Sequence, residues 1–390
     1  MNRERGRRIL VINPGSTSTK VAVFEGDDMV AEASLTPPDG RNRGGIWEEF
    51  PDRLMSLREW MDREKIDLWS LEAVVGRGGL LRPLEGGTYE VTEAMLADAR
   101  GNLQGYHASN LGCALARAIA DAGNMEGRRV AELKEMEVGG EGPSPPAEGK
   151  GYLEEPSEIR AFVVDPVSTD EFHSLARYSG LREISRKSLS HALSIHALVR
   201  QVCQRDGRPL KGSSFVVAHM GGGISVCPVR DGRILDANNS NSGGPFSPSR
   251  AGGLPTQELL DLAYSGSHTR TQLRAMTLKE GGLVSYLGTD DATAVEARIE
   301  AGDERAREVY QAMAYQIAKE IGAMATVLRS RPDAILLTGG LAASELLVGW
   351  VRGRVAFLAP VEVLPEVGEM RALAQGALRV LRGEEVPKIY

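Results

Sequence analysis

The chain has 390 residues, more than the roughly 250–300 that one hydrophobic core can serve, so two domains are expected. It carries 46 basic and 53 acidic residues, and its net charge of −7 argues against non-specific nucleic-acid binding. Its three cysteines, Cys113, Cys203 and Cys227, form no CxxC pair, which argues against a zinc site or a disulfide framework. No apolar run is long enough for a membrane span or a signal peptide, so we expect a cytoplasmic protein.

The chain opens with three predicted strands, at residues 8–13, 19–25 and 29–35. The loop between the first two reads NPGSTSTK, residues 13–20. Its backbone N–H groups and hydroxyls could line an anion site. The Walker spacing is absent, because Lys20 is followed by VAVF, which is typical of a strand and not of a helix. Taken alone, the motif is weak, and an ordinary hairpin is the commoner structure for such a loop.

The rest of the first half alternates between predicted helices and strands. In chain order we expect a helix at 47–64, a buried strand in 71–81, helices at 92–99 and 109–122, and a strand at 161–166. Residues 123–160 are rich in Gly, Pro and Glu and lack an apolar period, which favours a solvated surface loop or a partly disordered insert.

The second half repeats the opening design. A long helix at 182–205 is followed by a predicted strand, Gly-rich turn, strand, turn and strand over 213–237. This order matches residues 8–35 and indicates a duplicated α/β domain. The turn HMGGGIS could be a bulged hairpin, but three consecutive glycines also permit close approach of a ligand.

The last quarter ends in three further predicted elements. A helix is expected at 302–330, a strand at 333–342 that runs into the turn TGGLA, and a last helix at 367–382 that could return to the first domain. TGGLA is either a plain strand-to-helix connection or a ligand site at the carboxyl end of a strand.

Several charged residues stand beside these Gly-rich stretches. Arg77 in VGRGGLL and Arg250 in NSGGPFSPSRAGG could each grip a carboxylate or a phosphate, although most loop arginines are only solvated. Three of the six histidines lie near the motifs, namely His107, His191 and His219; a lone helical histidine is more often structural. Asp165 and Glu369 could hold Mg²⁺, although most carboxylates are simply solvated.

The motifs taken together resemble the acetate/butyrate kinase family. They run in order through nearly the whole chain, except for 123–160: ILVINPGSTSTKVAVF, VVGRGGLL, GNLQGYHASNLG, VVDPVSTDEF, SLSHALSIHALV, VVAHMGGGISV, NNSNSGGPFSPSRAGGLP and LLTGGLA. Within the family, NPGSTSTK and NNSNSGGPFSPSR are more similar to the butyrate-specific branch than to the acetate-specific one.

The resemblance implies a duplicated RNase H-like fold of the actin-like ATPase type, with ATP and Mg²⁺ in an interdomain cleft. The expected domains are residues 1–170, completed by 367–390, and residues 171–366. The resemblance also implies the reversible reaction butanoate + ATP ⇌ butanoyl phosphate + ADP. It further implies that the protein forms a homo-oligomer. No nucleic-acid or membrane partner is expected.

The resemblance also assigns roles to individual residues. The transfer site would contain Arg77, His191 and Arg250, and Gly78 and His107 would lie with Arg77 and Arg250 around the substrate. ATP would be bound by Asn13, Ser16, Ser18, Lys20, His219, Gly221, Gly222, Gly223, Gly339 and Gly340, and Mg²⁺ by Asp165 and Glu369. VVGRGGLL is expected to supply part of an apolar pocket for the acyl tail.

Other functions remain open at this stage. The same design could phosphorylate acetate, propanoate or 2-methylpropanoate. A sugar kinase would need a catalytic Asp, where this sequence has Arg and His. A chaperone or filament protein of the same fold would need a further domain or polymer contacts, and we expect neither. A non-catalytic nucleotide sensor is disfavoured by the presence of Arg77, His191, Arg250 and Asp165 together.

Overall fold

The computed structural model describes residues 7–37, 45–138, 158–365 and 367–390, with the backbone alone for 129–138. The chain divides into two compact units. Unit 1 comprises Met1–Pro83, Gly87–Ser168 and Gly368–Tyr390, and unit 2 comprises Leu84–Gly86 and Thr169–Val367. Among the described residues, no helix combines the length and the apolarity needed to cross a bilayer.

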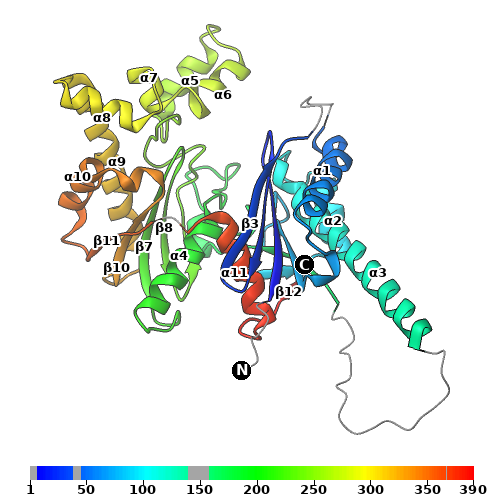
Figure 1. Cartoon of the computed structure of the whole chain (residues 1–390). Coiled ribbons are helices and arrows are strands. Elements are labelled where there is room, and N and C mark those ends of the chain that lie inside the picture. Colours follow the sequence, from blue (N-terminus) through cyan, green and yellow to red (C-terminus); the bar gives the residue numbers. More distant parts are fainter. Residues whose placement is uncertain (1–6, 38–44, 139–157, 366) are drawn as a thin grey trace. The chain divides into compact units, whose positions relative to one another are not determined.

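Unit 1 is built on a seven-stranded sheet (Figure 1). Its strands are β1 (Arg8–Pro14), β2 (Thr19–Glu25), β3 (Asp28–Leu35), β4 (Ala73–Arg77), β5 (Thr88–Glu90), β6 (Arg160–Val164) and β12 (Lys388–Ile389), in the order β12-β5-β6-β4-β1-β2-β3. Strands β1, β4 and β6 are parallel neighbours, and β1, β2 and β3 form an antiparallel meander.

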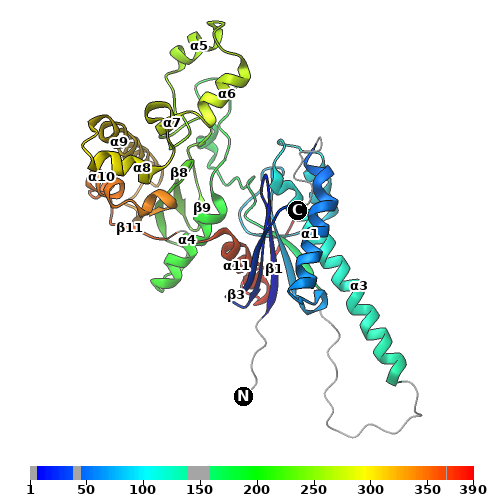
Figure 2. The same ribbon diagram turned by 45° about the horizontal axis from the view of Figure 1, so that its top comes forward.

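Helices cover both faces of this sheet. They are α1 (Phe50–Arg63), α2 (Glu93–Arg100), α3 (Gly112–Val138) and α11 (Glu369–Leu381), with short 3-10 helices at Ile46–Glu49, Leu68–Ser70 and Ala108–Leu111. Leu10 and Ile12 of β1 pack in one core with Leu57 of α1 and Leu115 of α3. Figures 1 and 2 show α11 on the opposite face from α1 and α3.

Unit 2 repeats the central part of this design. Its strands are β7 (Ser214–Met220), β8 (Ile224–Arg230), β9 (Arg233–Ile234), β10 (Ala334–Thr338) and β11 (Val361–Val363), in the order β11-β10-β7-β8-β9. As in unit 1, the first strand of an antiparallel meander pairs in parallel with a later strand, and that strand pairs in parallel with the next. The predicted duplication of an RNase H-like α/β design is confirmed.

The helices of unit 2 fall into two groups. Helices α4 (Ala192–Arg205), α9 (Glu304–Val327) and α10 (Glu345–Val355) belong to the sheet layers, with 3-10 helices at Ser174–Arg177 and Gly340–Ala343. Helices α5 (Thr256–Tyr264), α6 (Arg270–Leu278), α7 (Gly282–Leu287) and α8 (Ala292–Glu300) are inserted between β9 and α9. In Figure 2, α5 and α6 project away from the sheet of this unit.

Two predictions about element boundaries are wrong. The helix predicted at 182–205 begins only at Ala192, because the preceding segment forms other bonds: Arg186 donates to the Ala176 carbonyl at 2.7 Å and Ser188 Oγ to the Thr169 carbonyl at 2.9 Å. The backbone N–H of Arg186 is also diverted, because it donates to the Arg177 carbonyl at 2.9 Å and not to a carbonyl four residues before it.

The predicted insert 123–160 is the second correction, because α3 continues through its first part to Val138. Gly123 permits close packing, since a Cβ there would lie 2.5 Å from Ile159 Cδ1. Asn124 bonds both the N–H and the carbonyl of Ile159, at 2.7 and 3.1 Å. Both residues therefore serve packing rather than helix termination. The remainder of the predicted insert, 139–157, lies outside the described residues.

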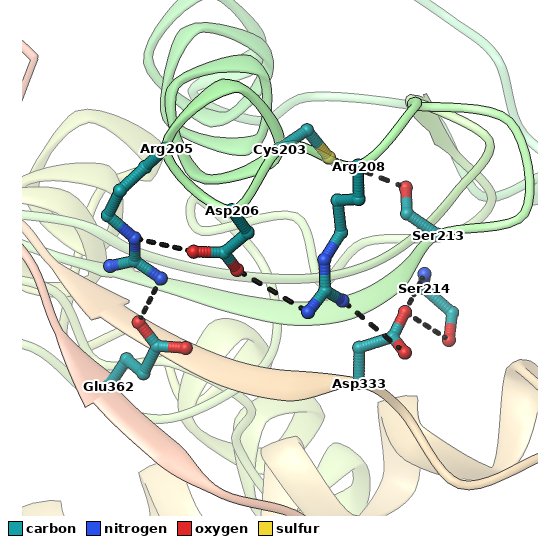
Figure 3. Close-up of polar contacts among 8 residues, drawn as sticks. All are labelled: Cys203, Arg205, Asp206, Arg208, Ser213, Ser214, Asp333 and Glu362. Atoms are coloured by element: carbon teal, nitrogen blue, oxygen red, sulfur yellow. Dashed lines mark hydrogen bonds and ion pairs between the residues drawn. The ribbon is translucent and has the colours of Figure 1, made fainter.

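A chain of polar contacts joins the amino ends of β7 and β10 to the end of α4 (Figure 3). Arg205 contacts Glu362 and Asp206 at 2.7 Å each, and Arg208 contacts Asp206 at 3.4 Å and Asp333 at 3.5 Å. Asp333 Oδ2 also accepts from the Ser214 N–H at 2.7 Å. These contacts lie at the amino ends of β7 and β10, whereas the Gly-rich turns follow the carboxyl ends of the same strands.

Asp333→Ala removes the carboxylate oxygen that accepts a hydrogen bond from the backbone N–H of Ser214, the first residue of β7. We expect it to lower the unfolding free energy by about 1 kcal/mol, the usual scale for one hydrogen bond. Asp333→Asn keeps an amide oxygen for the Ser214 N–H, so its loss should be smaller. Urea unfolding measures both variants. Equal losses would show that the exposed ion pair with Arg208, and not the bond to the strand, carries the stabilisation.

Candidate functional site

In unit 1, polar side chains stand at the carboxyl ends of three parallel neighbours. Asn13 lies at the end of β1, Arg77 ends β4, and Asp165 directly follows β6. The strand register pairs Ile12 with Gly76 and Arg77 with Val164, so all three ends reach the same edge of the sheet. This edge is where open α/β sheets bind ligands.

Arg77 is the centre of this group. Its Nη1 donates to the Asp165 carbonyl at 2.9 Å, and its Nε lies 4.0 Å from Glu369 Oε1. Asn13 Nδ2 donates to the other oxygen of Glu369 at 2.8 Å. Burial lowers the pKa of Arg77, and the charges of Glu369 and Asp165 oppose that shift. Because a guanidinium has five N–H donors, Arg77 retains donors for an added anion.

Asp165 and Glu369 supply the carboxylates of this edge. Asp165 is buried, has a backbone φ of 39°, and accepts from the Gly87 N–H at 2.7 Å through Oδ1. Glu369 is the first residue of α11, and its side chain is 47% exposed. No cluster of three or more His, Cys, Asp or Glu residues that could hold a metal occurs in the part of the chain that the structure describes. The carboxylate oxygens of Asp165 and Glu369 are nevertheless donors of the type that Mg²⁺ prefers. Mg²⁺ usually takes one or two carboxylates and completes its shell with phosphate oxygens and water.

His107 lies close enough to Arg77 and Glu369 to respond to their charges. Desolvation and the positive charge of Arg77 lower the pKa of His107, while Glu369 opposes the shift. Its Nδ1 accepts from the Ser109 N–H at 3.2 Å and caps the 3-10 helix Ala108–Leu111. A neutral imidazole bonded in this way carries its proton on Nε2. His107 is therefore held by its Nδ1 contacts, and Nε2 is its second polar atom.

Glycines let the loop after β4 pack against the start of α3. A Cβ on Gly112 would lie 2.1 Å from the Arg77 carbonyl, and one on Gly79 would lie 2.1 Å from Asn110 Oδ1. A Cβ on Gly78 would lie 2.4 Å from Pro166 Cβ. The position of the Arg77 backbone therefore depends on the absence of side chains on both sides of it.

The hairpin loop NPGSTSTK stands at the same end of β1. The Gly15 N–H closes the turn by donating to the Ser18 carbonyl at 2.8 Å. Ser16 and Lys20 are exposed, and Lys20 is the cross-strand partner of Asn13. Ser18 is half-buried and accepts at Oγ from Ser34. The loop thus presents hydroxyl groups and one ammonium beside the Arg77 group.

In unit 2, two stacked histidines lie at the carboxyl end of β7. The rings of His191 and His219 are 4.1 Å apart with an interplanar angle of 17°. Ser225 on β8 is fully buried, is paired with His219 across the hairpin, and lies 2.9 Å from His191 Nδ1 through Oγ.

Arg250 lies directly against the Gly-rich turn of this hairpin. A Cβ on Gly223 would lie only 2.3 Å from Arg250 Nη1, so the guanidinium packs closely against the turn. The same Nη1 donates to Ser240 Oγ at 2.7 Å, and Ser247 Oγ donates to the Gly222 carbonyl at 2.6 Å. Partial burial lowers the pKa of Arg250.

The last Gly turn adjoins the same strand end. Gly339 has a φ of 86°, and a Cβ on it would lie 2.5 Å from the Met220 carbonyl. Gly340 and Gly222 have open space around a would-be Cβ, and Gly221 has only distant neighbours. Backbone conformation and packing therefore require glycine at 339, whereas a side chain at 223 would have to displace the Arg250 guanidinium. The other predicted nucleotide-binding glycines have space for a Cβ.

Each unit thus brings together a part of the predicted site. In unit 1 these residues are Asn13, Arg77, Asp165 and Glu369, with His107 nearby, and in unit 2 they are His191, His219, Gly223 and Arg250. The sequence prediction missed Ser225, although pairing Met220 with Ile224 across the predicted turn would have placed it opposite His219.

The sequence is closely similar to proteins of one family across almost its whole length. The model of the acetokinase family matches residues 176–355. "Probable butyrate kinase 2" of Caldanaerobacter subterraneus subsp. tengcongensis is 42% identical over 385 residues, which cover 98% of this chain and 99% of that protein. The chain belongs to the acetokinase family. A second relative, "Probable butyrate kinase" of Listeria welshimeri, is 43% identical over 385 residues, which cover 98% of this chain and 99% of that protein.

Solved structures support the fold of this acetokinase family member. The acetate kinase of Porphyromonas gingivalis has a TM-score of 0.72 at 16% identity, with 96% of this chain and 100% of that chain covered. A propionate kinase from Francisella tularensis has a TM-score of 0.68 at 16% identity, with 95% and 98% covered. The predicted fold class is therefore confirmed.

Gly112→Ala tests whether the close packing at Arg77 is required. The added Cβ meets a backbone carbonyl, so we expect a loss of about 1–3 kcal/mol in unfolding free energy. Gly349→Ala in α10 is the matched control, because its Cβ would meet open space and should stabilise by about 0.5–1 kcal/mol. Thermal unfolding compares the two variants. A Gly112→Ala protein as stable as wild type would contradict the packing described.

Proposed function

We propose that this chain is a butyrate kinase, which transfers the γ-phosphoryl group of ATP to the carboxylate of butanoate with Mg²⁺. The family supports a carboxylate phosphotransferase, and the relatives that cover nearly the whole chain are named as butyrate kinases. The observation that carries the proposal is the placement of Arg77 with Asn13 and Glu369, at a strand edge where an oxyanion would be bound.

This reaction needs no general base. A carboxylate is already ionised near neutral pH, and its oxygen attacks the γ-phosphorus as the bond to the β-phosphate oxygen breaks. Five negative charges enter with butanoate and ATP, and five leave with butanoyl phosphate and ADP, so no proton is gained or lost. Catalysis then consists of positioning and of neutralising the clustered negative charge. Arginines, N–H groups and hydroxyls are the groups suited to that task.

Each unit supplies one set of such groups. In unit 1, Arg77 binds the substrate oxyanions, and the NPGSTSTK loop with Lys20 binds phosphate. In unit 2, Arg250 lies against the triple-glycine turn and binds the transferring group. When bound, Mg²⁺ neutralises phosphate charge, and Asp165 and Glu369 are the residues that would hold it.

His191 acts in this account as a hydrogen-bond donor. Ser225 Oγ contacts its Nδ1, which fixes the ring orientation and leaves Nε2 as the second polar atom. Stacking on His219 restrains the ring further. A donor held in this way loses little entropy when it bonds an equatorial phosphoryl oxygen in the transition state.

Preference among short acids depends on the acyl pocket, to which VVGRGGLL would contribute. Each methylene adds only about 1 kcal/mol, so acetate, propanoate and 2-methylpropanoate should be weaker but detectable substrates. A cytoplasmic location and a homo-oligomeric state stay predictions.

The activity is tested by incubating the protein with ATP, Mg²⁺, butanoate and hydroxylamine. Trapped acyl phosphate appears as butanoyl hydroxamate, and the same assay over several short acids ranks them. We expect the highest kcat/KM with butanoate. Absence of hydroxamate with every acid would reject the carboxylate kinase, and a clear preference for a different acid would reject only the butyrate assignment.

Arg250→Lys keeps the charge but removes the planar fork of the guanidinium. We expect kcat to fall by about 10²–10³-fold, the scale of one lost transition-state donor. Arg208→Lys, in the contact chain at the opposite edge of the same sheet, is the control and should leave kcat unchanged. Equal kcat values for both variants would remove Arg250 from the mechanism.

A further inference from the structure

A buried arginine lies beneath the NPGSTSTK loop. Arg53 is only 2% exposed and shares the buried face of α1 with Leu57, Trp60 and Met61, at helical spacing. Because the other three members of this face are apolar, the arginine needs partners to offset the cost of its burial. Those partners lie in the loop and at the start of α1.

The guanidinium of Arg53 bonds the loop at three points. Its Nη2 donates to the Gly15 carbonyl at 2.9 Å, and its Nη1 donates to Thr19 Oγ1 at 2.8 Å and to the Ser18 carbonyl at 3.3 Å. The Ser18 carbonyl is also the acceptor that closes the turn with the Gly15 N–H. One planar group therefore joins both sides of the loop.

Glu49 completes the arrangement from the other side. Its Oε2 accepts from Nε and Nη2 of Arg53 at 2.9 and 2.7 Å, and its side chain is only 17% exposed. The positive charge of Arg53 is thus paired within the protein. Arg53 contacts the loop from its buried side, whereas Gly15 and Ser16 are exposed on the other.

We propose that Arg53 is a positioning residue that holds the NPGSTSTK loop in its anion-binding shape; for its kinetic consequence this rests on the proposed kinase function. Carbonyl oxygens repel phosphate, whereas N–H and O–H donors attract it. By binding the carbonyls of Gly15 and Ser18 from beneath, Arg53 keeps these acceptors turned toward α1. The N–H and hydroxyl donors of the loop are then presented to phosphate without a rearrangement on binding.

Only a planar fork can make these bonds together, which separates arginine from lysine here. Arg53→Lys keeps the charge near Glu49 but cannot reach the two carbonyls and Thr19 at once. We expect KM for ATP to rise about tenfold, equivalent to one lost hydrogen bond. KM for butanoate should stay within about twofold, because Arg53 acts on the phosphate loop alone.

A second readout does not require kinase activity. Deuterium uptake at millisecond labelling times should rise about tenfold for amides of residues 15–19 in Arg53→Lys, with no change in β4 or β10. Arg8→Lys is the matched control. Arg8 bonds Glu25 and Ser70 at the other end of the same β1–β2 hairpin, so neither readout should change.

The outcomes separate this inference from the proposed function. Faster loop exchange in Arg53→Lys supports the positioning role even if the wild-type protein makes no acyl phosphate, in which case the kinase proposal fails alone. An active wild type with unchanged exchange and unchanged KM for ATP in Arg53→Lys would overturn the inference. If Arg53→Lys misfolds, Arg53→Gln, which retains an amide donor, is measured by the same criteria.

Discussion

Both candidate anion-binding groups depend on one constraint, the parallel pairing of the first strand of each meander with strands that arrive later in the chain. In unit 1 this pairing brings Asn13, Arg77 and Asp165 to one edge, although more than 150 residues separate the first from the last. In unit 2 it places Gly339 against the end of β7. The antiparallel hairpins then add a turn to the same edge, so the strand order determines which polar groups meet.

The arginines at these edges are partly or fully buried, which has two consequences. Burial would strengthen their interaction with a bound anion, because the effective dielectric constant is lower than in water. It also requires close packing and defined partners. The backbone of Arg77 packs against Gly112, and the guanidinium of Arg250 packs against Gly223. Gly112 is therefore needed for the packing around the Arg77 backbone.

The sequence predicted what depends on local alternation and turn chemistry. The two strand meanders, their Gly-rich turns and the residues at the strand ends were identified because each leaves a short-range pattern. The prediction of helix boundaries was wrong where contacts between distant residues determine the structure. The segment before Ala192 bonds carbonyls elsewhere in the chain instead of forming a helix, and Gly123 packs against Ile159 within a helix that continues past it. Arg53 is a charged residue on the otherwise apolar stripe of a correctly predicted helix. This exception to the apolar pattern was the available signal that its side chain has buried polar partners.

In the proposed reaction the carboxylate oxygen itself is the nucleophile toward phosphorus, and no general base is needed. The most direct measurement is ³¹P NMR of a reaction containing ATP, Mg²⁺ and butanoate labelled with ¹⁸O in its carboxylate. Attack by the carboxylate oxygen predicts an acyl phosphate signal with the upfield isotope shift of a phosphorus atom bonded to ¹⁸O. Formation of ADP with unlabelled inorganic phosphate, and no labelled acyl phosphate, would contradict it.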